Sequence, residues 1–296
     1  MSKNHFASIY FLFLLTFSYT EELTPLDLNS LELLKVNGKN REYHNLYQSK
    51  INYIVEGPCV LDIYSRLAFP ELAKKIPPYK FSVNVMGENY KDSLVIKQYF
   101  RKDKKVKSLA HPKHSFTLAG KDIINIPKGK HHVEFSSIDS NSKVLLRIIS
   151  KPFKRVEKVV SVQAIRGEEK KILRNRKDDN SQYFSLNKLK GNHKLSFEIK
   201  GPRMVQIYSR LGSPSFGKRD YYQFKIRREG KLKGTYHMFA QKSDKWMQIL
   251  PDEKSDNSVS VKRKSFFEVP KGSHSFEIEL ISPSEKDVFF KVQQEK

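Results

Sequence analysis

An internal repeat constrains this chain more than any other feature of its sequence. The stretch GPCVLDIYSRL, Gly57 to Leu67, returns 144 residues later as GPRMVQIYSRL, Gly201 to Leu211, with seven of eleven positions identical. Two further segments recur in the same order at nearly the same offset: IPKGKH at 126–131 returns as VPKGSH at 269–274, and KVLLRI at 143–148 returns as DVFFKV at 287–292. These landmarks predict a duplication, and 296 residues are enough for two domains with a core each.

The alternation of apolar and polar residues predicts strands rather than helices. Residues 79–85 alternate strictly, Gly87-Glu88-Asn89 forms a turn, and 93–100 completes a hairpin. Turn signals return about every 8–12 residues, which is typical of β-sandwiches. We predict an all-β chain of two tandem, duplicated antiparallel β-sandwich domains. They should be jelly-roll-like, because the strand count is high and no Cys…Trp…Cys pattern is present.

The predicted organisation has five parts: signal peptide 1–20, leader 21–30, first sandwich 31–150, linker 151–158 and second sandwich 159–296. Within each copy, Gly-Pro should break one strand into two, at Gly57-Pro58 in the first. Pro127-Lys128-Gly129 should form a turn between two strands. The charged stretch 168–179 looks like an insertion that forms a turn or an irregular loop.

The N-terminus has the features of a secretory signal. Lys3 is followed by a run at 6–17 that is almost wholly apolar or small, too short to span a bilayer comfortably. We expect a secreted or periplasmic protein with no membrane span after cleavage, the alternative being an uncleaved anchor. Cys59 is the single cysteine, so the chain has no internal disulfide.

The repeated strand carries a candidate ligand-binding pair. Tyr64 and Arg66 point to one face of the strand, as do Tyr208 and Arg210 in the second copy. A tyrosine ring can stack on a sugar, and a guanidinium can bind a carboxylate or phosphate. With the single tryptophan, Trp246, these four residues form the predicted binding set. The alternative is structural: the tyrosine packs and the arginine bonds an internal carboxylate, for which Glu134 and Glu277 are candidates.

No catalytic or cofactor motif is present in the sequence. There is no Gly-x-Ser-x-Gly elbow, P-loop, HExxH or calcium loop, so we predict no catalytic residue, metal or cofactor. His131 and His274 begin strands on an apolar face, where a histidine is usually structural. Paired carboxylates cannot be found from sequence alone, so a carbohydrate-active lyase or hydrolase stays an alternative.

The net charge of +23 indicates an anionic partner, or else a solvated lysine-rich surface. The predicted basic patch consists of Arg101, Lys102, Lys104, Lys105, Lys262, Arg263 and Lys264. Further basic clusters include Lys151 and Arg228, and aromatic residues interleave with these clusters at Tyr99, Phe266 and Phe267. For an exported chain, an anionic glycan or a lipopolysaccharide-like envelope component is a better partner than nucleic acid.

The predicted function is therefore binding of an anionic or carbohydrate component of the cell envelope, without catalysis. Two alternatives stay open. The chain could be a structural or assembly protein of the envelope that works through protein contacts, or it could be the carbohydrate-active enzyme considered above.

Overall fold

The computed structural model describes residues 20–27, 30–47, 50–88, 90–139, 141–153, 158–166, 169–175, 179–215, 220–248 and 258–296. The predicted signal segment, apart from Thr20, lies outside these ranges. The described residues form strands and connecting turns without a helix. They accordingly contain no helix of the length and apolarity that crossing a membrane requires.

Among the described residues, ten strands begin before the predicted linker: β1 (Glu21–Glu22), β2 (Leu31–Val36), β3 (Lys39–Asn45), β4 (Lys50–Pro70), β5 (Tyr79–Gly87), β6 (Tyr90–Gln98), β7 (Val106–Ser108), β8 (His114–Phe116), β9 (Gly120–Ser137) and β10 (Lys143–Pro152). Ten follow it: β11 (Val159–Ser161), β12 (Glu169–Asn175), β13 (Asn180–Leu186), β14 (Lys194–Leu211), β15 (Asp220–Arg228), β16 (Lys231–Ala240), β17 (Lys242–Gln248), β18 (Ser258–Ser260), β19 (Arg263–Ser282) and β20 (Val288–Glu295).

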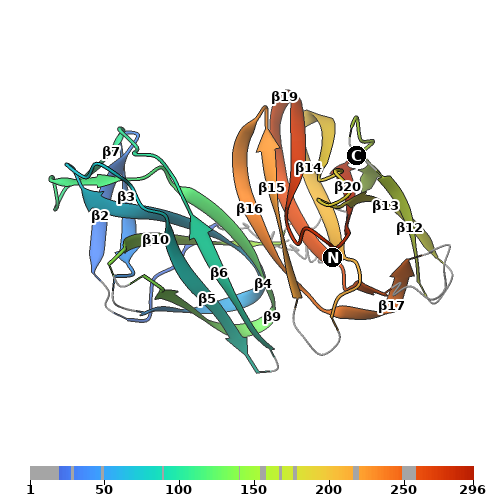
Figure 1. Cartoon of the computed structure of the whole chain (residues 1–296), viewed down its shortest axis with the longest axis horizontal. Coiled ribbons are helices and arrows are strands. Elements are labelled where there is room, and N and C mark those ends of the chain that lie inside the picture. Colours follow the sequence, from blue (N-terminus) through green and yellow to red (C-terminus); the bar gives the residue numbers. More distant parts are fainter. Residues whose placement is uncertain are drawn as a thin grey trace, which may run out of the picture.

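The two sets of strands have the same topology. In the first, β4 pairs with β9 and β10, β5 with β6 and β9, and β3 with β2 and β10. In the second, β14 pairs with β19 and β20, β15 with β16 and β19, and β13 with β12 and β20. The chain is two β-sandwiches that lie side by side (Figure 1).

The longest strands of each domain pass from one sheet of its sandwich to the other. The first half of β4 pairs with the second half of β9, next to β5, whereas the second half of β4 lies between β9 and β10. The register shifts where Gly57 stands opposite Gly129. A Cβ atom on Gly57 would come within 1.8 Å of the Pro127 carbonyl oxygen. Bulges and bends of this kind let a strand contribute to two sheets.

The predicted strand break and turn are therefore wrong. Gly57-Pro58 lies inside the continuous strand β4, and Pro127-Lys128-Gly129 lies inside β9, on the strand directly opposite. The second domain repeats the arrangement, with Gly201 opposite Gly272. Two of the three repeated landmarks thus meet at one bulge in each domain.

Three further expectations differ from the structure. The supposed insertion 168–179 contains strand β12, the counterpart of β2, because both pair with the strand that follows them. Residues of the predicted leader form β1, which pairs with β10. Strand β10 itself reaches Pro152, inside the predicted linker, of which residues 154–157 lie outside the described ranges. The domain boundaries stay predictions.

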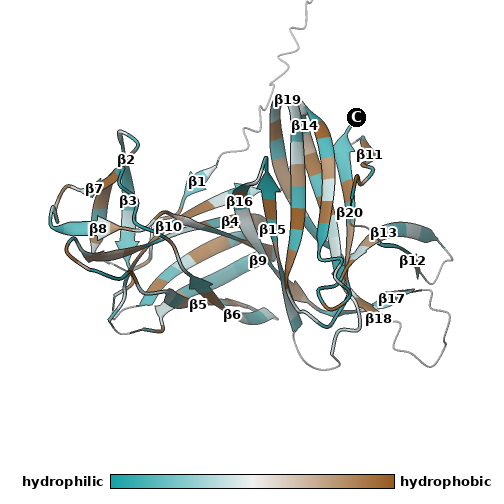
Figure 2. Ribbon diagram, turned by 45° about the horizontal axis from the view of Figure 1, so that its top comes forward, coloured by the Kyte–Doolittle hydropathy of each residue, from teal (hydrophilic) through white to brown (hydrophobic). Residues whose placement is uncertain are grey.

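Each sandwich has its own core. Alternate residues of the long strands are apolar and face inward, which Figure 2 shows as bands along β14 and β19. Leu146 belongs to the main core of the first domain, whereas its neighbour Leu145 belongs to a smaller cluster on the opposite face of the sheet. That smaller cluster also holds Tyr43 and Phe116, and the second domain has a similar one around Tyr183.

The domains are joined by pairing between strands. Thr235–His237 of β16 runs parallel to Asp122–Ile124 of β9. The buried His237 Nε2 lies 2.8 Å from the buried Asp122 Oδ1, and Gln98 donates to the other carboxylate oxygen at 2.6 Å. Phe239 from β16 packs into the core of the first domain. Strand pairing, buried hydrogen bonds and apolar packing therefore all connect the two domains.

Candidate functional site

The repeated arginine of the first domain is buried. Arg66 is 4% exposed, and its Nη1 donates to Asp103 Oδ2 at 3.0 Å and to the Thr117 carbonyl oxygen at 2.5 Å. Its Nε donates to the Tyr43 hydroxyl at 3.3 Å. The guanidinium thus links β4 to the smaller apolar cluster around Tyr43. Its carboxylate partner is Asp103 and not the predicted Glu134.

Arg210 repeats this arrangement in the second domain. It is 3% exposed, with Nη1 2.7 Å from the Ser260 carbonyl oxygen and Nε 3.4 Å from the Tyr183 hydroxyl. Its guanidinium carbon lies 4.7 Å from the centre of the Trp246 ring. The ligand-binding prediction for Arg66 and Arg210 is accordingly replaced by the structural alternative, because both side chains are directed into the protein.

The two repeated tyrosines are partly buried beside cations. Lys121 Nζ lies 5.7 Å from the Tyr64 ring centre, and Lys262 Nζ lies 4.3 Å from that of Tyr208. Burial raises the pKa of both phenols. The predicted binding set therefore forms one cluster in each domain and not a single site.

The predicted basic patch also divides in two. Arg101, Lys102, Lys104 and Lys105 are exposed on the connection between β6 and β7. The other three lie near the domain boundary, where the Arg263 Nε donates to the Phe239 carbonyl oxygen at 2.6 Å.

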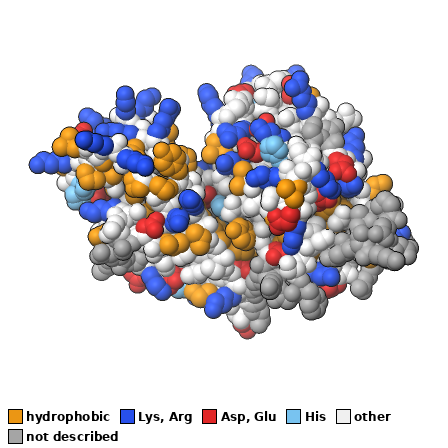
Figure 3. Space-filling model, in the orientation of Figure 1, with side chains coloured by type: hydrophobic (Ala, Val, Ile, Leu, Met, Phe, Trp, Pro, Cys, Tyr) orange, Lys and Arg blue, Asp and Glu red, His pale blue; other side chains and the backbone are white. Residues whose placement is uncertain are grey.

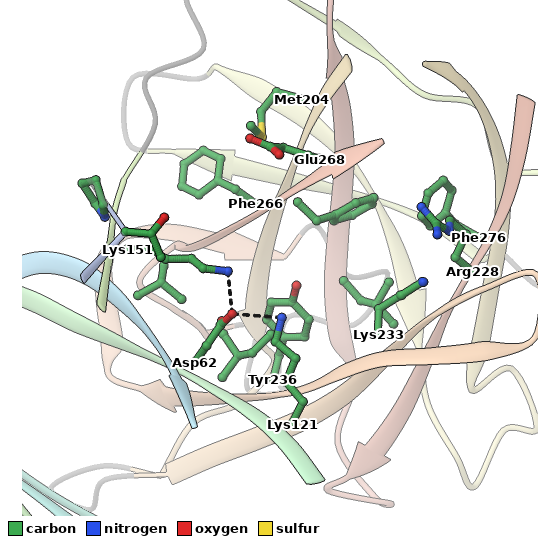
Figure 4. A pocket seen from close by; sticks show the side chains of 16 residues that line it. Asp62, Lys121, Lys151, Met204, Arg228, Lys233, Tyr236, Phe266, Glu268 and Phe276 are labelled. Carbon is green, nitrogen blue, oxygen red and sulfur yellow. Dashed lines mark hydrogen bonds and ion pairs between the residues drawn. The ribbon is translucent and has the colours of Figure 1, made fainter. Parts of the chain in front are cut away.

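A cleft of about 370 Å³ lies between the domains (Figure 4). Its lining comprises Thr20, Val60, Asp62, Lys121, Ile123, Lys151 and Pro152 on one side, and Met204, Ile226, Arg228, Lys233, Tyr236, Phe266, Phe267, Glu268 and Phe276 on the other. Val60 and Asp62 come from the repeated strand β4, on the face opposite its core residues, and Met204 holds the position in β14 that Val60 holds in β4. We call this the interdomain cleft.

On the first domain's wall, Asp62 is bound by two lysines. Lys121 Nζ lies 2.9 Å and Lys151 Nζ 2.6 Å from Asp62 Oδ2, the contacts dashed in Figure 4. The carboxylate is almost fully buried, while both lysines keep exposed surface. One acid between two cations leaves a net positive charge on this wall.

Two further cations line the opposite wall. Arg228 ends β15 and Lys233 lies on β16, just across the turn between them. Among the described residues neither has an ion pair, and Arg228 Nε is a buried donor without an acceptor. Burial, followed by the charge of Arg228, lowers the pKa of Lys233. An anion placed between them would relieve this repulsion.

Aromatic side chains complete the wall of the second domain. Phe267 packs on Phe276 with ring centres 4.9 Å apart, and Phe266 packs on Phe153, the residue that follows β10, at 5.5 Å. The Tyr236 hydroxyl points into the cleft in Figure 4. Aromatic faces beside unpaired cations suit a ligand that carries both a weakly polar ring face and negative charge.

The sequence indicated part of this cleft. Lys151, Arg228, Phe266 and Phe267 belong to clusters of basic and aromatic residues noted there. Asp62, Lys121, Lys233 and Tyr236 stand alone in the sequence, and only the parallel pairing of β9 with β16 brings them together. No group of three or more His, Cys, Asp or Glu side chains within the described ranges is placed to hold a metal ion.

Fold and cleft define a tandem β-sandwich protein with a basic, aromatic-walled cleft between its domains. No family model matches the chain, and no curated protein is similar to it. Solved structures with some likeness include the tandem CBM22 domains of Xyn10C from Paenibacillus barcinonensis (9% identity, TM-score 0.26, covering 95% of this chain and 99% of that one). The ANXUR2 extracellular domain from Arabidopsis thaliana is another (10%, 0.23, 95% and 89%), as is PNGF-II (9%, 0.23, 93% and 64%). Scores this low carry no functional argument.

Proposed function

We propose that the chain is an exported, non-catalytic protein that binds an anionic carbohydrate of the cell envelope in the interdomain cleft. The observation that carries the proposal is that cations without an ion-pair partner among the described residues lie beside aromatic rings in one cavity. Arg228 and Lys233 would bind carboxylate, phosphate or sulfate groups, while Phe266 and Phe267 would stack on sugar rings.

Two of the cleft's titratable groups, Asp62 and Tyr236, support binding over catalysis. Two lysines bind Asp62 Oδ2, so this carboxylate is already engaged by the wall of the cleft. Burial raises the pKa of Tyr236, and the nearby Asp62 charge raises it further. A tyrosine in this state is a poor general base near neutral pH.

Binding to polygalacturonate tests the proposal, with dextran as the uncharged counterpart. The purified mature chain should bind polygalacturonate more tightly than dextran, and its affinity should fall as salt rises, because the charged contacts are screened. The double variant Arg228→Glu/Lys233→Glu should lose roughly tenfold or more in affinity, since each hydrogen bond to a charged group contributes about 1.5–3 kcal/mol.

The matched control is Lys200→Glu/Lys271→Glu, which makes the same charge change at two exposed positions of the second domain. Equal losses in both double variants would show that only the net charge matters. Failure of the wild-type chain to bind polygalacturonate or lipopolysaccharide at any salt concentration would refute the proposal.

A further inference from the structure

A second surface, remote from the interdomain cleft, combines exposed cations with exposed apolar side chains. The cations are Arg101, Lys102, Lys104, Lys105, Lys107 and Lys113. The apolar residues are Leu72, Tyr99 and Leu109, which are 92%, 70% and 57% exposed. We call these nine residues the basic rim.

Hydrogen bonds place the segments of the basic rim beside one another. Strand β8 pairs with Ala68–Pro70 on one side, and the Glu71 amide donates to the Lys113 carbonyl oxygen at 3.0 Å. On the other side the Asp103 amide donates to the Phe116 carbonyl oxygen at 2.8 Å. Figure 3 shows basic side chains gathered with apolar ones over this end of the first domain, which β2, β3 and β7 mark in Figure 1.

The rim's cations are not used within the fold. None of the six has an ion pair among the described residues, and the nearby Asp103 carboxylate is bound by Arg66. The duplicated architecture does not require all of them. The strand pairing aligns RKDKKVK at 101–107 with QKSDKWM at 241–247, where Gln241, Asp244 and Met247 replace Arg101, Lys104 and Lys107 and lysines stand only opposite Lys102 and Lys105.

Exposed apolar side chains among unpaired cations match one kind of partner. An anionic lipid bilayer attracts lysines through its headgroups and accepts leucine and tyrosine side chains at its interface. A soluble polyanion would use the cations but would leave Leu72 in water. We propose that the basic rim docks the protein on an anionic lipid surface, with Leu72 inserted at the headgroup boundary.

Co-sedimentation of the purified mature chain with lipid vesicles tests this. The chain should bind vesicles containing phosphatidylglycerol, and should bind pure phosphatidylcholine vesicles at least about tenfold more weakly. Leu72→Asp and Lys104→Glu/Lys105→Glu should each reduce binding about tenfold. The thermal midpoint of both should match the wild type, because all three side chains are exposed.

Two matched controls separate docking from general charge or hydrophobicity. Leu189→Asp alters a similarly exposed leucine of the second domain, and Lys200→Glu/Lys271→Glu makes the same charge change there. Both should bind phosphatidylglycerol vesicles like the wild type. Equal losses in the controls, or no binding of the wild type to vesicles, would overturn the proposal. It would also be overturned if Leu72→Asp bound vesicles like the wild type and soluble polygalacturonate abolished that binding. This last result would identify the rim as a polyanion site.

Discussion

The repeated serine and arginine of the Tyr-Ser-Arg-Leu segment are explained by a hydrogen-bond network present in both domains, which also includes the leucine backbone amide. The Ser65 hydroxyl lies 3.0 Å from the Tyr79 hydroxyl, and Ser209 lies 2.7 Å from that of Tyr222. The Leu67 amide donates to Thr117 Oγ1 at 3.0 Å, as the Leu211 amide does to a serine. Buried polar groups of this kind stabilise only when they are paired, which accounts for their joint retention.

Arg66→Gln tests the structural role of the repeated arginine. The shorter, neutral side chain cannot maintain the bonds to Asp103 and Thr117, so we expect the free energy of unfolding to fall by about 3 kcal/mol. Urea unfolding measures it. Arg41→Gln, at an exposed position on β3, should stay within about 0.5 kcal/mol of the wild type. Equal stability of the two variants would contradict the structural assignment.

At the scale of the element, the bulge explains why Gly-Pro and Pro-Lys-Gly recur together. They occupy opposite sides of the crossing between β4 and β9, and again between β14 and β19. The backbones approach so closely there that only glycine fits at position 57, and Gly201 meets the Pro270 carbonyl oxygen at 2.0 Å. The glycine and proline residues of the repeat are therefore explained by the close backbone approach that this bulge requires.

Gly57→Ala should be far more destabilising than an ordinary glycine substitution. The new Cβ would overlap a backbone carbonyl that cannot move without disturbing the bulge, so we expect a loss above about 3 kcal/mol. Gly191→Ala is the control: nothing lies within 4 Å of its Cβ, and the positive φ alone should cost about 1–2 kcal/mol. Chemical denaturation would compare them, and a smaller effect at Gly57 would refute the close approach.

At the scale of the whole molecule, we expect the interface to make the two sandwiches unfold as one cooperative unit. The buried pair of Asp122 and His237 spans the domains, and Asn125 donates to the Lys264 carbonyl oxygen at 3.0 Å. Removing one partner of a buried hydrogen bond usually costs about 1–3 kcal/mol, and more when the group left behind is charged, because that group loses its partner without regaining water.

His237→Ala should therefore uncouple the domains. We expect the wild type to unfold in one calorimetric transition and the variant in two, with the first at lower temperature. His193→Ala, which removes a partly buried histidine whose side chain makes no hydrogen bond among the described residues, should keep the single transition. One unshifted transition in His237→Ala would show that this pair does not couple the domains.

The sequence predicted the all-β sandwich fold because alternation and turn residues act locally. It did not predict the bulge, because Gly-Pro usually ends a strand and the opposing Pro-Lys-Gly is distant in sequence. The cleft was harder still: Asp62, Lys121 and Lys233 come from three strands, and their proximity depends on a parallel pairing between domains that no local pattern encodes. A tyrosine and an arginine on one strand face gave no indication of whether that face was buried.

The most direct test of the central claim, that the interdomain cleft is the binding site, is the effect of polygalacturonate on the ¹³C-labelled methionine methyl groups. Met204 lines the cleft, whereas Met86 lies on β5, and Trp246 reports on the cluster around Arg210. We predict that the Met204 resonance, assigned with Met204→Leu, shifts on titration while the Met86 resonance and Trp246 fluorescence stay constant. A change in Trp246 fluorescence with an unshifted Met204 resonance would contradict the account.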